Sequence, residues 1–300
     1  MFIFRAARSF TMYPRSFDYV APVDLGEAVE LLRKDAEARI LAGGQSLIPA
    51  LKLRVQSAKR LIDIARIEGL RYIRQDGQML TIGALTTVAA LANDRTVRSL
   101  APILREAAGQ IADPLVRNRG TIGGNLCQAD PVNDLPAVVL ALDASLVATS
   151  GRGERRVQAD SFFVGPGQTT LAPDEILTRI EIRLPEGRAG GAYRKLRKGS
   201  GGFSIAGAAS CLSVTDGGAV ARCRIAMTAV GSRVLRAENA ERALLGKVLT
   251  ESARNHAAEL AGKASQPSSD LTASKEYRRR ALCELVRDAV GLAYERATQP

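Results

Sequence analysis

Two short segments, each with adjacent glycines between an apolar strand pattern and an apolar helix pattern, most constrain what this chain can fold into. The first spans residues 40–49 (ILAGGQSLIP) and the second residues 120–131 (GTIGGNLCQADP). Glycine has no Cβ, so paired glycines let the main chain approach a bulky anion closely. Ser46, Thr121 and Asn125 can donate hydrogen bonds to phosphate oxygens. The two segments predict two loops closing on one long phosphate-bearing ligand, although the glycines alone fit tight turns without a ligand equally well.

Neither segment has a standard nucleotide-binding fingerprint. No Gly-Lys-Ser/Thr follows at the Walker spacing, and neither segment matches Gly-x-Gly-x-x-Gly. The chain is therefore expected to contain neither a P-loop nor a Rossmann unit in these segments.

The secondary-structure patterns predict an α+β fold whose first domain covers residues 12–187 in two subregions. The first subregion, about 12–65, is expected to hold a small β-α-β unit (strand 39–42, helix 46–55 and strand 60–64) after a helix that Asp24 and Glu27 begin as a capping box. The second, about 66–187, is expected to hold a hairpin around Asp76-Gly77 and several helices. Its expected strands are 70–74, 79–82, 145–149, 155–158 and 175–184; its helices are 87–93, 99–110 and one that Asp134 caps; a long polar loop, 113–120, delivers the second glycine pair.

A change of composition near Pro185-Glu186-Gly187 predicts a boundary, with a smaller α+β domain over residues 188–297. This domain is expected to contain a three-stranded sheet followed by helices. The strands are 192–196, 204–214 and 219–230, and the helices are 237–245, 250–261 and 274–296.

Charge and cysteine usage narrow the classes of partner. The net charge is +11, which fits a solvated basic surface or an acidic protein partner. Aromatic residues make up only 4% and the basic residues are spread out, which disfavours a nucleic-acid partner. No apolar run is long enough to span a membrane, and residues 1–11 lack a secretory-signal core and are expected to be an extension. Four scattered cysteines without a Cys-x-x-Cys pair predict no metal site built by this chain and a reducing cytoplasm.

Few side chains are available for acid–base catalysis. His256 is the only histidine, and it lies in a predicted helix far from both glycine pairs, where a surface or packing role is favoured. Cys127 could be a reactive thiol or a covalent flavin anchor, but a small buried residue is the favoured interpretation. Asp130 and Asp134 could pair as acid and base, yet loop capping and ribose contacts are preferred. This scarcity predicts no catalytic residue here and fits chemistry supplied by a cofactor.

Several of these motifs resemble those of a known family. Residues 42–49 and 121–125, with 130–131, 134–136 and 193–196 after them, resemble the FAD-binding medium subunits of the xanthine dehydrogenase family, the molybdenum hydroxylases that include aerobic carbon monoxide dehydrogenase. The resemblance extends from about Met12 over nearly the whole chain. It implies the vanillyl-alcohol-oxidase-like (PCMH-type) fold with FAD between the two subregions of the first domain, and a C-terminal domain similar to that of the carbon monoxide dehydrogenase flavoproteins.

The resemblance also implies a set of FAD-binding residues. One stretch would wrap the pyrophosphate and the adjoining flavin, a second would hold the phosphates from the other side, a third would lie near the adenosine half, and a fourth near the isoalloxazine ring. In that order they are Ala42, Gly43, Gly44, Gln45, Ser46, Leu47 and Ile48; Thr121, Gly123, Gly124 and Asn125; Ile111, Ala112 and Asp134; and Ile176, Leu177 and Lys195. Asp130, from the motif 130–131, is also expected to bind the cofactor.

By the same resemblance, the chain would be an electron-transfer subunit. A large partner would hold the molybdopterin cofactor and the organic substrate, a small partner would carry [2Fe–2S] clusters, and an external acceptor would take electrons from FAD, in a dimer of heterotrimers. Gln45 stands where histidine is common in the carbon monoxide enzymes, and Asn125 where some have aspartate, which weakens any claim for carbon monoxide as substrate. A self-contained flavin reductase of the enolpyruvyl-sugar type and a flavin-free scaffold are the alternatives.

Overall fold

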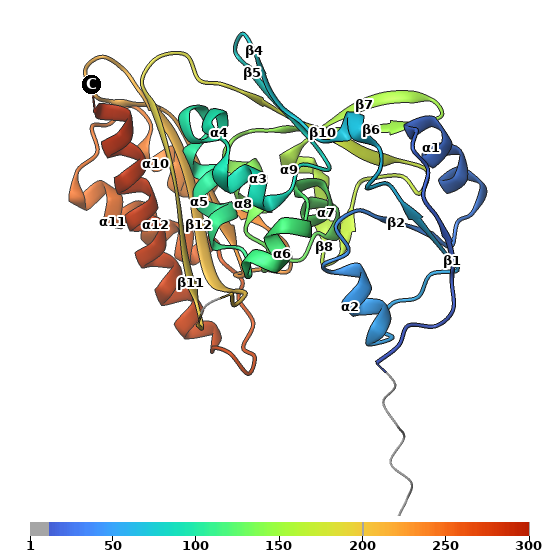
Figure 1. The fold of residues 1–300 in the computed structure, drawn as a ribbon. Coiled ribbons are helices and arrows are strands. Elements are labelled where there is room, and N and C mark those ends of the chain that lie inside the picture. Colours follow the sequence, from blue (N-terminus) through green and yellow to red (C-terminus); the bar gives the residue numbers. More distant parts are fainter. Residues whose placement is uncertain (1–11, 200, 300) are drawn as a thin grey trace, which may run out of the picture.

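The computed structural model describes residues 12–199 and 201–299, so the extension expected over residues 1–11 lies outside the described residues. The first subregion is a parallel three-stranded sheet with the order β1-β3-β2, and two helices accompany it (Figure 1). Its elements are β1 (Asp18–Val20), α1 (Leu25–Lys34), β2 (Ala38–Leu41), α2 (Leu47–Lys52) and β3 (Arg60–Asp63).

The helix α1 begins where the capping pattern predicts. The Asp24 carboxylate accepts a hydrogen bond from the Glu27 main-chain N–H at 3.1 Å, which satisfies one of the free donors at the helix start. Val29 and Leu32 on its inner face are buried in the core of this subregion. The predicted β-α-β unit around residues 39–64 is confirmed, although α2 ends at Lys52 rather than at residue 55.

The second subregion is built on a five-stranded antiparallel sheet with the order β4-β5-β10-β6-β7. The hairpin predicted around Asp76-Gly77 joins β4 to β5, and Gly77 has the positive φ (52°) that such a turn favours. The elements of the sheet and of its margins are η1 (Glu68–Leu70), β4 (Ile73–Asp76), β5 (Met79–Gly83), β6 (Ser145–Ser150), β7 (Gly153–Gln158), α9 (Ala159–Phe162), β8 (Phe163–Gly165), β9 (Gln168–Thr169) and β10 (Ile176–Arg183).

The helices of this subregion correct two predictions. The expected helix 99–110 is divided into α4 and α5, because Pro102 lacks the N–H that would continue α4 and instead occupies the first turn of α5. The expected polar loop 113–120 is wrong: it contains α6, with the Asp113 carboxylate capping Val116 N–H and Pro114 in the first turn. The helices are α3 (Val88–Asn93), α4 (Arg95–Leu100), α5 (Pro102–Gln110), α6 (Pro114–Arg119), α7 (Ile122–Gln128) and α8 (Leu135–Ala141).

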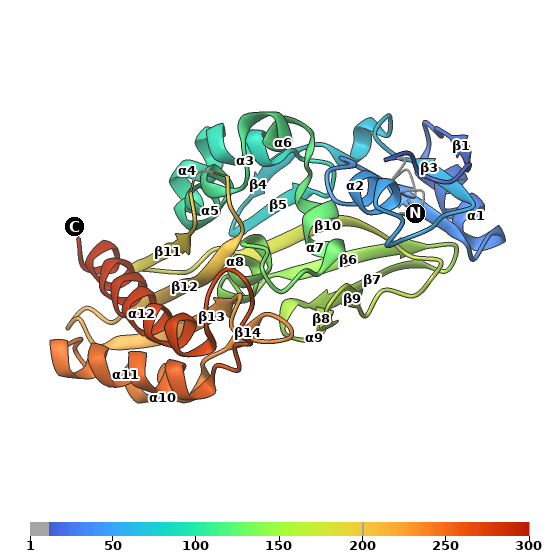
Figure 2. The same ribbon diagram turned by 90° about the horizontal axis from the view of Figure 1, so that it is seen from below.

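The C-terminal region forms an antiparallel sheet of four strands rather than the three predicted, because the short β14 adds to its edge. Figure 2 shows α10, α11 and α12 on one side of this sheet, and α5 and α8 pack on the other. The elements are β11 (Ala189–Arg197), β12 (Ser204–Val214), β13 (Val220–Thr228), β14 (Leu235–Arg236), α10 (Glu238–Leu244), α11 (Glu251–Ala264) and α12 (Lys275–Thr298).

Three apolar cores hold the molecule together, one in each subregion and one between the C-terminal sheet and its helices. The largest core includes buried residues of the C-terminal sheet, among them Tyr193 and Ala209, and so continues across the junction of the two regions. These features confirm the α+β class with its two-subregion first part. The domain boundary near residue 187 falls in the connection from β10 to β11 and stays a prediction.

Candidate cofactor site

The two glycine-bearing segments, which come from different subregions, lie in direct contact. A Cβ built on Gly43 would lie 2.2 Å from the main-chain oxygen of Arg119 and 2.8 Å from Cα of Gly120. A Cβ on Gly124 would lie 3.8 Å from Cβ of Ala42. The two segments therefore meet between the subregions, as expected for loops that hold one ligand.

The glycines serve this contact in ways that differ from the prediction. The missing side chains of Gly43 and Gly123 are directed at other protein segments: a Cβ on Gly123 would lie 2.6 Å from Cβ and 2.8 Å from the main-chain oxygen of Ala84. These two glycines are needed for close packing of one segment on another rather than for the approach of an anion. Gly44 has φ +73°, a left-handed conformation that residues with a Cβ rarely adopt. The second pair lies in the first turn of α7 and not in a loop.

The two segments differ in whether their main-chain N–H groups already donate hydrogen bonds within the described structure. At the start of α7, Ile122 N–H donates to Thr86 O at 3.0 Å and Gly123 N–H to Ala84 O at 2.9 Å. Among the described residues, by contrast, no acceptor receives the N–H groups of residues 43–47. Free main-chain N–H groups are good partners for phosphate oxygens. The first segment can therefore present main-chain donors, whereas the second offers side chains.

Three polar side chains at this contact keep unused hydrogen-bonding capacity. The amide oxygen of Asn125 is buried without a partner in the described structure, which a hydroxyl of a bound nucleotide could supply. Thr121 is 5% exposed; its hydroxyl oxygen accepts from Gly124 N–H at 3.1 Å, and its proton remains to be donated. Ser46 is exposed and makes no capping bond to α2. This donor and acceptor set fits a ribose and a diphosphate.

Ile111 and Ala112 lie where α5 ends, next to the strand β11. Their main-chain oxygens accept hydrogen bonds from the Arg117 guanidinium at 2.7 and 3.0 Å, and Ala112 has a left-handed φ of 42°. The connection from β11 to β12 lies against them, because a Cβ on Gly201 would be 3.5 Å from Ala112 C. Their predicted adenosine contact stays a prediction.

Asp134 is the centre of a buried polar cluster that joins the first region to the C-terminal sheet. Its carboxylate accepts from Tyr193 Oη at 2.5 Å, Ser204 Oγ at 2.6 Å and Lys195 Nζ at 2.7 Å. The side chains of Asp134 and Lys195 are only 4% and 2% exposed. Burial, and then the neighbouring Asp134 charge, raises the pKa of Tyr193 well above its usual value. These contacts leave little of the Asp134 and Lys195 side chains accessible to a ligand, and their predicted ribose and flavin contacts stay predictions.

Of the two aspartates that follow α7, only Asp130 has the capping role that the sequence predicts. Asp134 occupies the N-cap position of α8, but its side chain makes no capping hydrogen bond because the three donors above engage it. Asp130 closes its own loop, accepting from Val132 N–H at 3.0 Å and from the Gln128 amide at 3.2 Å. The preferred loop-capping role of Asp130 agrees with this geometry.

Ile176 and Leu177 begin β10 and are almost completely buried, at 3% and 4% exposure. Ile176 belongs to the core against which Ala42 packs, and Leu177 to the core of the second subregion. The strand is also joined to the second glycine segment through Ala84, whose N–H donates to Thr178 O and against which Gly123 packs. The structure thus brings these two residues close to both glycine segments, while their contact with a flavin ring stays a prediction.

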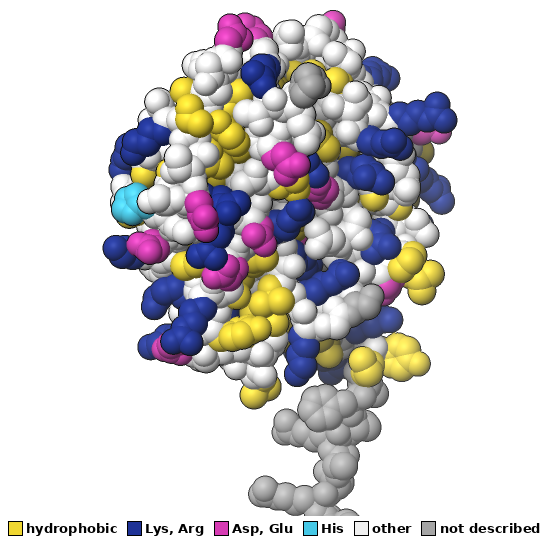
Figure 3. Space-filling view, turned by 90° about the vertical axis from the view of Figure 1, so that its left-hand side faces the viewer, with side chains coloured by type: hydrophobic (Ala, Val, Ile, Leu, Met, Phe, Trp, Pro, Cys, Tyr) yellow, Lys and Arg dark blue, Asp and Glu magenta, His cyan; other side chains and the backbone are white. Residues whose placement is uncertain are grey.

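Cys127 and His256 have the properties of packing and surface residues. Burial raises the pKa of the Cys127 thiol to about 12, so it remains protonated at neutral pH. His256 is exposed on α11. Figure 3 shows basic side chains dispersed among acidic and apolar ones on the face that it presents, without a single basic stripe.

Sequence reasoning missed the residues that organise the site from a distance. Asn133, Tyr193 and Ser204 contact the predicted site residues across 8 to 70 positions of sequence. No local pattern marks them, although Tyr193 lies within one of the motifs.

Within residues 12–199 and 201–299, no group of three or more metal-binding side chains is found, and no helix is long and apolar enough to cross a membrane.

Comparisons with known proteins identify two family domains in the chain. Residues 15–185 match the family model of the FAD binding domain in molybdopterin dehydrogenase, and residues 191–293 match the CO dehydrogenase flavoprotein C-terminal domain. The carbon monoxide dehydrogenase medium chain of Hydrogenophaga pseudoflava is 40% identical, over 95% of this chain and 99% of its own length. The alpha subunit of the 6-hydroxypseudooxynicotine dehydrogenase complex of Paenarthrobacter nicotinovorans is 37% identical, over 95% and 97%.

Solved structures show the same similarity. A structure of carbon monoxide dehydrogenase from Hydrogenophaga pseudoflava superposes with a TM-score of 0.92 and 42% identity, over 94% of this chain and 99% of that one. Quinoline 2-oxidoreductase from Pseudomonas putida 86 superposes with a TM-score of 0.90 and 34% identity, over 95% and 99%. The predicted family, fold, oxidoreductase class and FAD cofactor are confirmed. The chain belongs to the FAD-binding medium subunits of the molybdenum hydroxylases, the family that includes carbon monoxide dehydrogenase.

Proposed function

We propose that this chain transfers electrons from the [2Fe–2S] clusters of a small partner subunit to an external acceptor by way of FAD. The observation that carries the proposal is the contact between Gly43 and the Arg119–Gly120 main chain, which joins a segment with free N–H groups to one with unused polar side chains. When bound, FAD supplies the ability to take up electrons singly and to release them in pairs.

The roles of the chain's own residues follow from their free hydrogen-bonding capacity. The N–H groups of residues 43–47 and the Ser46 hydroxyl would bind the diphosphate. Thr121 would donate to the phosphates from the other side, and Asn125 would pair its buried amide with a nucleotide hydroxyl. Protein packing fixes both segments before the ligand arrives, so binding FAD orders little additional chain and loses little entropy.

The organic substrate is expected to bind in another chain. Relatives that are similar to this chain at 34–40% identity are named for dehydrogenases or hydroxylases of carbon monoxide, 6-hydroxypseudooxynicotine and nicotine. Medium subunits of similar sequence thus serve complexes with chemically different substrates, which supports a substrate pocket outside this subunit.

The partners belong to the same proposal. A large molybdenum subunit and a small [2Fe–2S] subunit would assemble with this chain as a dimer of heterotrimers in the cytoplasm. The external acceptor would be NAD, a quinone, oxygen or a carrier protein. The net charge of +11 is compatible with docking on acidic partner surfaces.

Purification with and without the partners tests the function. The full chain alone should carry the visible absorbance of oxidised flavin and should fail to oxidise the organic substrates that the assembled complex oxidises. In the complex, substrate should bleach the flavin. Substrate turnover by the isolated chain would contradict the proposal, as would NADPH oxidation with an enolpyruvyl sugar, which the alternative reductase would catalyse. A colourless chain that binds no added FAD would support the flavin-free alternative.

A further inference from the structure

Asn125 is held in place by main-chain contacts at both ends of a short helix. The helix α7 is seven residues long; its first two N–H groups bind Thr86 O and Ala84 O, and its C-cap is Ala129, which has a left-handed φ of 47°. The Asn125 side chain, whose buried amide oxygen has no partner in the described structure, lies in the middle of this helix. Its position therefore depends on what fixes the end of the helix.

Asn133 makes that attachment. Its amide nitrogen donates to the main-chain oxygen of Asn125 at 3.2 Å and to the Gln128 side-chain oxygen at 2.6 Å. Asn133 is 7% exposed, so water cannot readily replace either bond. The Gln128 amide continues to Asp130, and Asn133 N–H returns to Asp130 O at 3.0 Å. The result is a closed set of hydrogen bonds that joins α7 to the loop before α8.

The C-terminal sheet fixes this loop from the other side. The Thr228 hydroxyl, which is fully buried, lies 2.6 Å from Asn133 O and 2.8 Å from Pro131 O, and Ala229 N–H also donates to Pro131 O at 2.8 Å. Thr228 ends β13. A continuous series of hydrogen bonds therefore runs from the C-terminal sheet through Asn133 to the main chain of Asn125.

We propose that Asn133 is a positioning residue for FAD: it transmits the position of Thr228 in the C-terminal sheet to Asn125, and it affects FAD binding only through Asn125. This inference rests on the proposed contact between Asn125 and FAD. Neither Asn133 nor Thr228 is proposed to touch the nucleotide. Loss of the Asn133 amide frees the end of α7, so Asn125 can no longer be held where its single hydrogen bond to the nucleotide is formed.

A double-mutant cycle on the full chain tests the proposal, with FAD titrated by fluorescence and the visible circular dichroism of the bound flavin recorded. Asn125→Ala should raise the Kd for FAD about tenfold, the effect of one hydrogen bond to a buried group. Asn133→Ala should raise it by a similar factor and change the dichroism of the flavin. The Kd of the combined variant should again be raised about tenfold, because both changes remove the same interaction. Independent effects would raise the Kd about a hundredfold.

Thr228 provides a second route to the same answer if Asn133→Ala does not fold. Thr228→Val should raise the Kd and show the same lack of additivity with Asn125→Ala, and Thr228→Ser, which keeps the hydroxyl, should restore the wild-type Kd. Ser265→Ala is the matched control, because the buried Ser265 hydroxyl also donates to a main-chain oxygen, at 2.7 Å, but to that of Gly262 in α11 and not to the loop before α8. It should lower stability without changing the Kd.

The outcomes separate the inference from the function on which it rests. The positioning role would be overturned, with FAD binding itself intact, if the fold-changes of the Kd multiplied in the combined variant of Asn125 and Asn133, or in that of Asn125 and Thr228. A wild-type Kd in both Asn133→Ala and Thr228→Val would overturn it too. Failure of the unaltered chain to bind FAD would instead overturn the proposed function.

Discussion

A Cβ on Gly43 would lie 2.2 Å from the main-chain oxygen of Arg119, so the two glycine segments can meet only because residue 43 has no side chain. Gly43→Ala is therefore expected to push the segments apart. Overpacking of this kind costs about 1–3 kcal/mol, and the displaced N–H groups would no longer face one ligand. FAD should be lost on gel filtration, and titration with added FAD should give a Kd raised by at least about tenfold.

Gly109→Ala is the matched control for this change. Gly109 lies in α5, and a Cβ there would meet no atom within 4 Å. Alanine should stabilise the helix by up to about 1 kcal/mol and leave FAD binding unchanged. A Gly43→Ala chain that retains FAD as tightly as the Gly109→Ala chain would show that the contact between the segments does not form the site.

The buried pair Asp134–Lys195 should be far more sensitive to single substitutions than to a double one. Lys195→Met leaves the Asp134 carboxylate buried without its cation, which typically costs about 3–5 kcal/mol of unfolding free energy. Adding Asp134→Asn removes the unpaired charge, and the asparagine oxygen can still accept from Tyr193 or Ser204. The double variant should therefore be more stable than Lys195→Met alone in urea unfolding.

An exposed pair provides the comparison. Arg152 and Asp174 lie 2.8 Å apart, but the arginine side chain is 68% exposed. Arg152→Met should lower the unfolding free energy far less than Lys195→Met does, because water and salt screen an exposed pair. Equal losses for Lys195→Met and Arg152→Met, or strictly additive losses for the two buried substitutions, would contradict the account of the buried cluster.

Sequence patterns predicted well those features that depend on neighbouring residues. Asp24 and Glu27 marked the start of α1, and Asp76-Gly77 marked the hairpin, because each signal involves bonds within a few residues. The wrong predictions concern residues whose partners lie far away in the sequence. Gly123 was predicted to lie against a ligand, yet it packs against Ala84, which is 39 residues away. Asp134 was predicted to cap a helix, yet its carboxylate accepts hydrogen bonds from the distant Tyr193 and Ser204. Tertiary contacts decide such positions, and one sequence does not reveal them.

The high pKa of the Cys127 thiol should make the protein less stable in alkali. The folded pKa, about 12, exceeds the usual value of 9.0, so the stabilisation from a protonated thiol is complete below about pH 9. As the pH rises from 9 towards 12, the unfolded chain loses this proton and the folded chain keeps it, and the stabilisation is lost progressively. At about pH 10 the loss from this group is about 1.4 kcal/mol.

Urea unfolding of the wild type and of Cys127→Ala at about pH 8 and about pH 10 measures this contribution. The alanine variant should lose less unfolding free energy between the two pH values than the wild type does. Iodoacetamide should label Cys127 slowly in the folded protein and rapidly in urea. Fast labelling in the folded state would favour the reactive-thiol interpretation.

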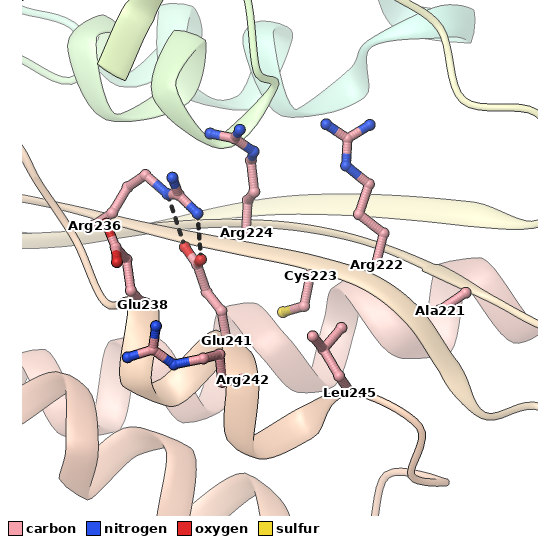
Figure 4. A pocket seen from close by; sticks show the side chains of 9 residues that line it. All are labelled: Ala221, Arg222, Cys223, Arg224, Arg236, Glu238, Glu241, Arg242 and Leu245. Atoms are coloured by element: carbon pink, nitrogen blue, oxygen red, sulfur yellow. Dashed lines mark hydrogen bonds and ion pairs between the residues drawn. The ribbon is translucent and has the colours of Figure 1, made fainter. Parts of the chain in front are cut away.

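Asp143 places a negative charge where its helix disfavours one, and arginines of the C-terminal sheet compensate for it. It follows the end of α8, where the helix dipole is negative, and it has a left-handed φ of 56°. Its carboxylate pairs with Arg222 and, at 2.6 Å, with Arg224. Figure 4 shows both arginines extending away from α10, while Arg236 turns to Glu241.

Asp143→Asn is the substitution that isolates this charge, because asparagine tolerates the left-handed conformation. Arg222 is 61% exposed and Arg224 only 16%. The unfolding free energy should therefore fall by about 1 kcal/mol at low salt, and this loss should shrink as salt screens the pairs. Asp216→Asn, in the exposed turn between β12 and β13, should change little at any salt concentration. A loss at Asp143 that is independent of salt would mean that the geometry of the turn, and not the charge, holds the C-terminal sheet against α8.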